Sequence, residues 1–139
     1  MGNLDERKKI LIVDDEKIQL SIVEEILSSE FNVVSAESGK IALEIISNGY
    51  LPDLILLDII MPEMNGFELY NNIREINNFE NIPILFLTSV TEGVEIKRAK
   101  DIGAADYIMK PIKNSVLLNR VKNVISAYDY LKQAKNRMK

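Results

Sequence analysis

The sequence contains neither cysteine nor histidine. Without cysteine, the chain forms no disulfide, has no thiol nucleophile and offers no thiolate to a metal ion. Without histidine, it has no imidazole to act as a general base, to complete a Ser-His triad or to bind zinc. Any metal ion bound by this chain must therefore be held by oxygen ligands, which Mg²⁺, Mn²⁺ and Ca²⁺ prefer.

Long apolar runs and an excess of positive charge are also missing. No run approaches the roughly 18 apolar residues of a membrane-spanning helix, and the N-terminus lacks the apolar segment of a signal peptide. The formal net charge is −4, whereas a nucleic-acid surface is normally basic. With 139 residues, 47% of them apolar, the composition fits one globular domain. We expect a cytoplasmic protein whose domain contacts neither membrane nor nucleic acid.

Short apolar runs alternate with amphipathic segments along the chain. The apolar runs predict strands at residues 9–13, 32–36, 54–57, 84–87 and 105–109. The amphipathic segments predict helices at residues 17–28, 39–47, 67–76 and 92–101, and a last helix from residue 114. In the first helix, Ile18, Ile22 and Ile26 recur at four-residue spacing with Val23 and Leu27 beside them, so we expect an amphipathic helix that buries this face. This alternation predicts an α/β fold, a doubly wound five-stranded parallel sheet with helices on both faces.

Polar residues follow four of the apolar strands directly. They are Asp14 and Asp15 after the first strand, Asp58 after the third, Thr88 after the fourth and Lys110 after the fifth. In an open parallel sheet, the carboxyl ends of the strands form the edge where ligands bind. Three carboxylates at one edge repel one another, and Lys110 supplies a single positive charge, so an oxygen-bound cation such as Mg²⁺ is the natural second one. A carboxylate beside Mg²⁺ and a lysine is a reasonable nucleophile for phosphoryl transfer, which gives an aspartyl phosphate.

Each of these residues also has an ordinary structural explanation. Asp15 fits a helix N-cap, and Thr88 fits a cap at the entry to a helix. Asp58 is compatible with a simple strand end, and Lys110 with a solvated charge. The coincidence of four polar clusters on one edge is what favours a single site.

Four segments, in this order, resemble the receiver domain of two-component response regulators. They are ILIVDDE at 10–16, LILLDIIMPEMNG at 54–66, PILFLTS at 83–89 and ADYIMKP at 105–111. The resemblance covers about residues 8–125. It implies a flavodoxin-like sheet with strand order 2-1-3-4-5, an order taken from the family and not from the spacing of the strands. It also implies a function in two-component phosphorelay signal transduction.

The resemblance assigns the metal and phosphoryl chemistry to particular residues. Asp58 accepts a phosphoryl group from a phosphohistidine of a histidine kinase or a histidine phosphotransfer protein, so the missing imidazole belongs to the partner. Mg²⁺, with Mn²⁺ as an alternative, is bound by Asp14, Asp15, Asp58 and the backbone carbonyl of Ile60. The chain is then a phosphoacceptor switch and not an enzyme in the usual sense, because it catalyses only its own phosphorylation and slow dephosphorylation.

The resemblance also implies how phosphorylation is sensed. Lys110 contacts the phosphoryl group as a point charge, and the Thr88 hydroxyl hydrogen-bonds a phosphoryl oxygen. Tyr107 swings inward and couples Asp58 to the surface of the fourth helix, fifth strand and last helix. The Lys110–Pro111 bond is expected to be cis. Phosphorylation adds about −1.5 to −2 charges, which supplies the differential interaction that a population shift requires.

Two apolar residues suggest a long-lived phosphoryl group. Ile60 and Val90 lie two residues beyond Asp58 and Thr88, at positions that in this family flank the phosphoryl group and influence its hydrolysis. An apolar side chain neither orients nor activates an attacking water. We therefore expect slow intrinsic dephosphorylation.

Two other function classes use related folds. A phosphohydrolase with an aspartate nucleophile is the main alternative, but that class usually shows two aspartates separated by one residue, whereas Asp58 is followed by Ile59 and Ile60. A flavodoxin-like carrier has a phosphate-binding loop rich in Ser, Thr and Gly after its first strand, and this chain has none there.

The C-terminal region continues past the end of a minimal receiver domain. We expect residues 1–127 to form the receiver domain and residues 128–139 a helical extension. A stripe with spacing of four and three residues runs through Leu117, Val121, Val124, Tyr128, Leu131, Lys135 and Met138. We expect a connector to an output domain beyond Lys139 or a dimerising helix, and the alternative is a last helix that packs on the sheet and then frays.

Overall fold

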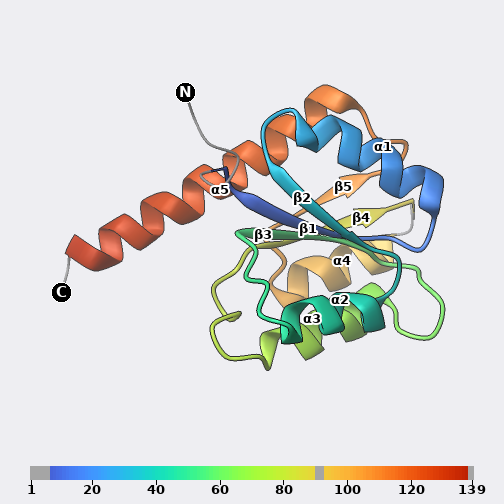
Figure 1. Ribbon diagram of the computed structural model, residues 1–139, viewed down its shortest axis with the longest axis horizontal. Helices are drawn as coiled ribbons and strands as arrows, with labels where there is room; N and C mark the ends of the chain where they lie inside the picture. The colour runs from blue at the N-terminus through green and yellow to red at the C-terminus, as the bar shows by residue number, and fades with distance from the viewer. Residues whose placement is uncertain (1–6, 90–92, 138–139) are drawn as a thin grey trace.

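The computed structural model describes residues 7–89 and 93–137, and its centre is a five-stranded parallel sheet with strand order β2-β1-β3-β4-β5 (Figure 1). The strands are β1 (Lys9–Val13), β2 (Asn32–Ala36), β3 (Leu54–Asp58), β4 (Ile84–Thr88) and β5 (Asp106–Met109). The helices are α1 (Lys17–Ser28), α2 (Gly39–Ser47), α3 (Gly66–Arg74), α4 (Gly93–Ile102) and α5 (Asn114–Arg137). The predicted α/β class, parallel sheet and strand order are confirmed.

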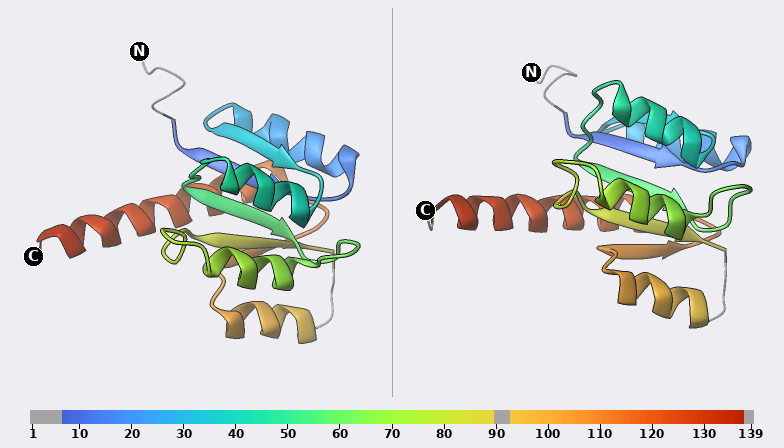
Figure 2. Two further views of the ribbon diagram at one scale, coloured as in Figure 1. Left: turned by 60° about the horizontal axis from the view of Figure 1, so that its bottom comes forward. Right: turned by 90° about the horizontal axis from the view of Figure 1, so that it is seen from below.

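Helices cover both faces of the sheet, α1 and α5 on one face and α2, α3 and α4 on the other (Figures 1 and 2). Alternate residues of the strands therefore enter two separate apolar clusters. Leu54 and Leu56 pack toward α1 and α5, whereas Ile55 and Leu57 pack toward α2 and α3. Because both faces of β3 are buried, no polar residue interrupts its apolar run before Asp58.

The predicted apolar face of α1 is buried only in part. Val23, Ile26 and Leu27 are buried as expected, together with Leu20. Ile18 and Ile22 are not, because their side chains are 79% and 44% exposed. The sequence of α1 carries two apolar stripes, and the angle at which the helix leaves β1 selects which of them meets the sheet.

The strands pair in a register that aligns their carboxyl ends. Val13 lies opposite Leu57, Asp58 opposite Leu87 and Thr88 opposite Met109. Asp58 and Thr88 are the last residues of their strands, one residue later than the predicted ends. Side chains at these strand ends therefore gather at one edge of the sheet.

Helix α5 continues without a break from Asn114 to Arg137, a length of 24 residues. Its first half buries Leu117, Val121 and Ile125 against the sheet. Its second half extends past the sheet, on the side where the strands begin (Figures 1 and 2). Within residues 7–89 and 93–137, none of the helices combines the length and apolar character that crossing a bilayer requires.

Candidate functional site

Three carboxylates lie together at the carboxyl edge of the sheet. Asp14 follows β1, Asp15 is its neighbour in the loop before α1, and Asp58 ends β3. A carboxylate oxygen of each lies within 4.8 Å of the others. Asp14 is fully buried and Asp58 is 4% exposed, whereas Asp15 is half-buried at the rim. The cluster is therefore mostly shielded from water, with one side open.

Lys110 supplies the positive charge of this cluster. Its Nζ lies 3.2 Å from Oδ2 of Asp14 and 3.5 Å from Oδ2 of Asp58, and its side chain is only 11% exposed. The other oxygen of Asp14 accepts a hydrogen bond from the backbone N–H of Glu16 at 3.0 Å. The Lys110–Pro111 peptide bond is cis, as expected. Lys110 thus reaches from the end of β5 to the acids after β1 and β3.

The charges of the site do not balance. The pKa of Asp58 is raised from 3.8 to about 7, chiefly by burial; Lys110 opposes this rise and the like charge of Asp14 adds to it. Burial lowers the pKa of Lys110, but the carboxylates of Asp58 and Asp14 outweigh this and raise it above its usual value. One ammonium group therefore does not compensate two buried acids, and the site favours a second cation or a proton.

The donor set fits an oxygen-bound divalent cation. The side chains of Asp14, Asp15 and Asp58 offer carboxylates, which hard cations prefer, and their oxygens are close enough to share one ion. Burial is the main cause of the raised pKa of Asp58, and a cation at this place would favour its charged form. The cluster thus fits a metal site that depends on acidic oxygen ligands.

The other predicted site residues lie around this cluster. Thr88, 1% exposed, ends β4, and its carbonyl accepts a hydrogen bond from the N–H of Lys110 at 2.7 Å. The ring of Tyr107 in β5 is half-buried, and the Nζ of Lys100 lies 5.7 Å from its centroid. The Ile60 side chain is 61% exposed beside the acids. Val90 lies outside the described residues, so its predicted effect on hydrolysis stays a prediction.

Gly66, the last residue of the segment LILLDIIMPEMNG, is a positioning residue to which the sequence alone gave no role. It begins α3, and its N–H donates a hydrogen bond to the carbonyl of Ile59 at 2.8 Å. A Cβ at this position would overlap the carbonyl oxygen of Asp58 and lie 2.9 Å from Cα of Ile59. Only glycine lets the start of α3 approach the backbone of Asp58 this closely, and the distance along the chain gives no signal of the contact.

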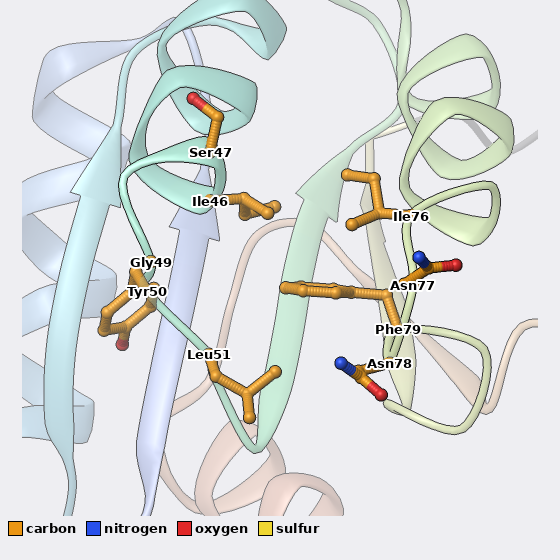
Figure 3. A pocket seen from close by; sticks show the side chains of 9 residues that line it. All are labelled: Ile46, Ser47, Gly49, Tyr50, Leu51, Ile76, Asn77, Asn78 and Phe79. Carbon is orange, nitrogen blue, oxygen red and sulfur yellow. The ribbon is translucent and has the colours of Figure 1, made fainter.

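A groove of about 380 Å³ lies at the opposite edge of the sheet, where the strands begin (Figure 3). It lies between the loop that precedes β3 and the loop that precedes β4. Its lining residues are Ile46, Ser47, Gly49, Tyr50, Leu51, Ile76, Asn77, Asn78 and Phe79. None of these carries a carboxylate or a cation, so the groove does not supply the chemistry of the acidic cluster.

Comparison with known proteins agrees with the geometry of the acidic edge. Residues 10–122 match the family model described as the response regulator receiver domain. The chain belongs to the response regulator receiver domain family.

Relatives of this receiver domain include whole regulators and parts of longer proteins. A probable cyclic di-GMP phosphodiesterase of Vibrio cholerae is 40% identical over 112 residues, 81% of this chain and 25% of that protein. The two-component response regulator ORR5 of Oryza sativa subsp. japonica is 35% identical over 107 residues, 76% of this chain and 80% of that protein. The solved chemotaxis response regulator CheY4 of Vibrio cholerae has a TM-score of 0.78 at 30% identity, covering 85% of this chain and 98% of that one.

These comparisons set the function class. The receiver domain acts in two-component phosphorelay signalling, and the aspartate phosphohydrolase alternative is not favoured. The chain spans only a quarter of the length of the Vibrio cholerae phosphodiesterase, so the phosphodiesterase activity belongs to that protein and is not assigned to this chain.

Proposed function

We propose that Asp58 is the residue that accepts the phosphoryl group. The observation that carries this proposal is the position of its carboxylate, 4% exposed at the end of β3, with the Nζ of Lys110 at 3.5 Å. Asp14 is more deeply buried and is engaged through both oxygens, with Lys110 and with the N–H of Glu16. Asp15 lies at the rim of the site and is more exposed to solvent than Asp58. Asp14 is also shielded and paired with Lys110, but both of its oxygens are already engaged, so we assign the acceptor role to Asp58.

The transfer step follows from the chemistry of the groups. A carboxylate oxygen of Asp58 forms a bond to phosphorus as the bond from phosphorus to the donor imidazole breaks, and the imidazole leaves with the electron pair. The donor is a phosphohistidine of a histidine kinase or a histidine phosphotransfer protein. Lys110 contacts the phosphoryl oxygens and offsets their charge. Asp14, Asp15, Asp58 and the carbonyl of Ile60 would hold Mg²⁺ or Mn²⁺, which would supply further positive charge near those oxygens.

The readout of the phosphoryl group is proposed to run through Thr88 and Tyr107. The Thr88 hydroxyl hydrogen-bonds a phosphoryl oxygen, and Tyr107 moves inward toward β4. Tyr107 lies opposite Phe86 in the β4–β5 register, two residue pairs before the pair of Thr88 and Met109, so the two switch residues lie close together on adjacent strands. Tyr107 also borders a cleft of about 530 Å³ on the β5–α5 surface, which supports a coupled change on that surface.

The test is phosphorylation with acetyl phosphate and Mg²⁺, followed by intact-mass measurement. The wild-type chain should gain one phosphoryl group that hydroxylamine removes, without steady consumption of acetyl phosphate. Asp58→Asn should gain none, whereas Asp101→Asn, a matched change at an exposed acid of α4, should behave as wild type. Phosphorylation of Asp58→Asn, or its loss in Asp101→Asn, would contradict the assignment.

The organisation of the chain is also part of the proposal. Residues 1–127 form the receiver domain in a cytoplasmic protein, and residues 128–139, of which the structure describes 128–137, are an extension that acts as a connector to an output domain, with a dimerising helix as the alternative. The support for the extension is the unbroken course of α5 to Arg137. Limited proteolysis tests this boundary, because an ordered domain should survive as a fragment that ends near Ala127.

A further inference from the structure

The outer part of α5 carries an incompletely covered apolar stripe. We call residues 128–137 the α5 tail. Its stripe continues from Val124, which is half-buried, through Tyr128, also half-buried, to Leu131, which is 57% exposed. These residues keep the spacing of four and three that two packed helices use. At about 1.5 Å per residue, α5 is about 36 Å long, so its outer turns lie beyond the sheet that covers its first half.

The α5 tail also forms one side of a groove. The groove has a volume of about 260 Å³ and is lined by Asn81, Tyr128, Leu131, Lys132 and Lys135. Asn81 belongs to the loop before β4, so the folded body supplies the opposite wall. The groove thus has an apolar floor and a cationic margin, and its position is fixed by the body of the receiver domain.

The charge of the α5 tail is opposite to that of the whole chain. It carries Lys132, Lys135 and Arg137 and a single acid, Asp129. That acid already pairs with Lys8, whose Nζ lies 3.2 Å from its carboxylate. The lysines at the groove therefore have no acidic neighbour within the tail to balance them, although the whole chain has a net charge of −4.

We propose that the α5 tail is a docking site for an amphipathic acidic helix of a partner protein. Apolar side chains of that helix pack on Tyr128 and Leu131, and its flanking carboxylates face Lys132 and Lys135. The affinity comes from apolar side chains at helical spacing, and the pairing of carboxylates with these lysines selects the partner. The site lies at the end of the sheet away from Asp58 and does not depend on the phosphoryl chemistry.

The same charges disfavour two other occupants. In a parallel pair of two copies, Lys135 of one tail would face Lys135 of the other, and the single acid of each tail, Asp129, is already paired with Lys8. A basic amphipathic helix can also lie on an anionic membrane. The wall at Asn81 argues against that occupant, because a bilayer surface does not enter a groove between a helix and a loop of the body.

The test uses the full chain and a fluorescent heptad peptide with leucine at positions a and d and glutamate at e and g. The control peptide carries lysine at e and g. Fluorescence anisotropy should show binding of the acidic peptide only, weakening as salt is added. The double variant Lys132→Glu/Lys135→Glu should lose about tenfold or more in affinity, whereas the charge-matched Lys40→Glu/Lys113→Glu, at exposed sites elsewhere, should not. Leu131→Ala should also weaken binding without loss of helical circular dichroism.

Several results would overturn the proposal. They are failure of the acidic peptide to bind, equal binding of the two peptides, and unchanged affinity of the Lys132→Glu/Lys135→Glu variant. Sedimentation velocity that shows dimers abolished by Leu131→Ala would assign the stripe to a second copy of the chain. Binding to phosphatidylserine vesicles through Lys132 and Lys135, without binding to the acidic peptide, would assign it to a membrane.

Discussion

Replacing Asp58 by asparagine should stabilise the metal-free protein at neutral pH, although it removes the proposed phosphoryl acceptor. Burial and the nearby Asp14 carboxylate make the charged form of Asp58 costly, and Lys110 only partly offsets this. Asparagine has nearly the same shape and no charge. The substitution therefore removes the cost of burying a charge, and with it the repulsion by Asp14, and leaves the packing at the end of β3 in place.

The magnitude follows from the pKa of Asp58. It is raised from 3.8 to about 7, a difference of about 3, and each unit of pKa corresponds to about 1.4 kcal/mol. The ionised carboxylate therefore costs the folded state about 4 kcal/mol. For a chain of 139 residues, this corresponds to roughly 10–15 °C in Tm.

The sign of the pH dependence is fixed by the same shift. The folded state binds the Asp58 proton more tightly than the unfolded chain does. The stability from this group is therefore fully present below about pH 4 and is lost as the pH rises to about 7. The advantage of Asp58→Asn over wild type should be near zero at about pH 4 and reach its full value at about pH 8.

The assay is urea denaturation in EDTA across this pH range, followed by circular dichroism. Asp101→Asn, at an exposed site, should match wild type at every pH. Adding Mg²⁺ should stabilise wild type by about 2.7 kcal/mol at a concentration one hundred times its dissociation constant, and Asp58→Asn by less. A difference between Asp58→Asn and wild type that does not change with pH, or a variant less stable than wild type at about pH 8, would refute this account of the charges.

Three further substitutions probe the site. Lys110→Met removes the cation beside Asp58, so it should abolish phosphorylation by acetyl phosphate and tighten the binding of a divalent cation. Calorimetry measures the cation affinity, and an affinity equal to that of the control Lys113→Met would count against this prediction. Gly66→Ala should lower the rate of phosphorylation at least about tenfold, because its Cβ displaces the Asp58 carbonyl. A wild-type rate would show that the loop accommodates the Cβ without moving Asp58. Ile60→Asn should shorten the lifetime of the phosphoryl group, measured by loss of phosphorylated mass, and an unchanged lifetime would reject the slow-hydrolysis hypothesis.

The fold could be predicted largely because the strands of the sheet are buried on both faces. In β3 and β4, every residue is buried, so the sequence shows continuous apolar runs with sharp ends. The surface helices were harder to predict in detail. In α1, the stripe through Ile18 and Ile22 is as periodic as the buried one, and only packing against the sheet distinguishes them.

The composition of the site could be predicted because chain order and sheet geometry work together. A parallel sheet brings the ends of its strands to one edge, so the residues after four apolar runs were expected to meet there. The contact between Gly66 and the backbone of Asp58 could not be predicted, since it depends on the path of the loop between β3 and α3. The roles of Thr88, Tyr107 and Ile60 stay predictions.

The sequence by itself determined which groups are available: oxygen ligands and one lysine at the strand ends, no thiol and no imidazole. It also determined the alternation of strands and helices, because these patterns are local. Only the tertiary structure decided the 3.2 Å contact between Lys110 and Asp14, which are 96 residues apart, and the raised pKa of Asp58. It likewise decided that Asn81 meets the α5 tail to form a groove. Burial and Coulomb energies depend on distances through space, and those distances exist only once the chain has folded.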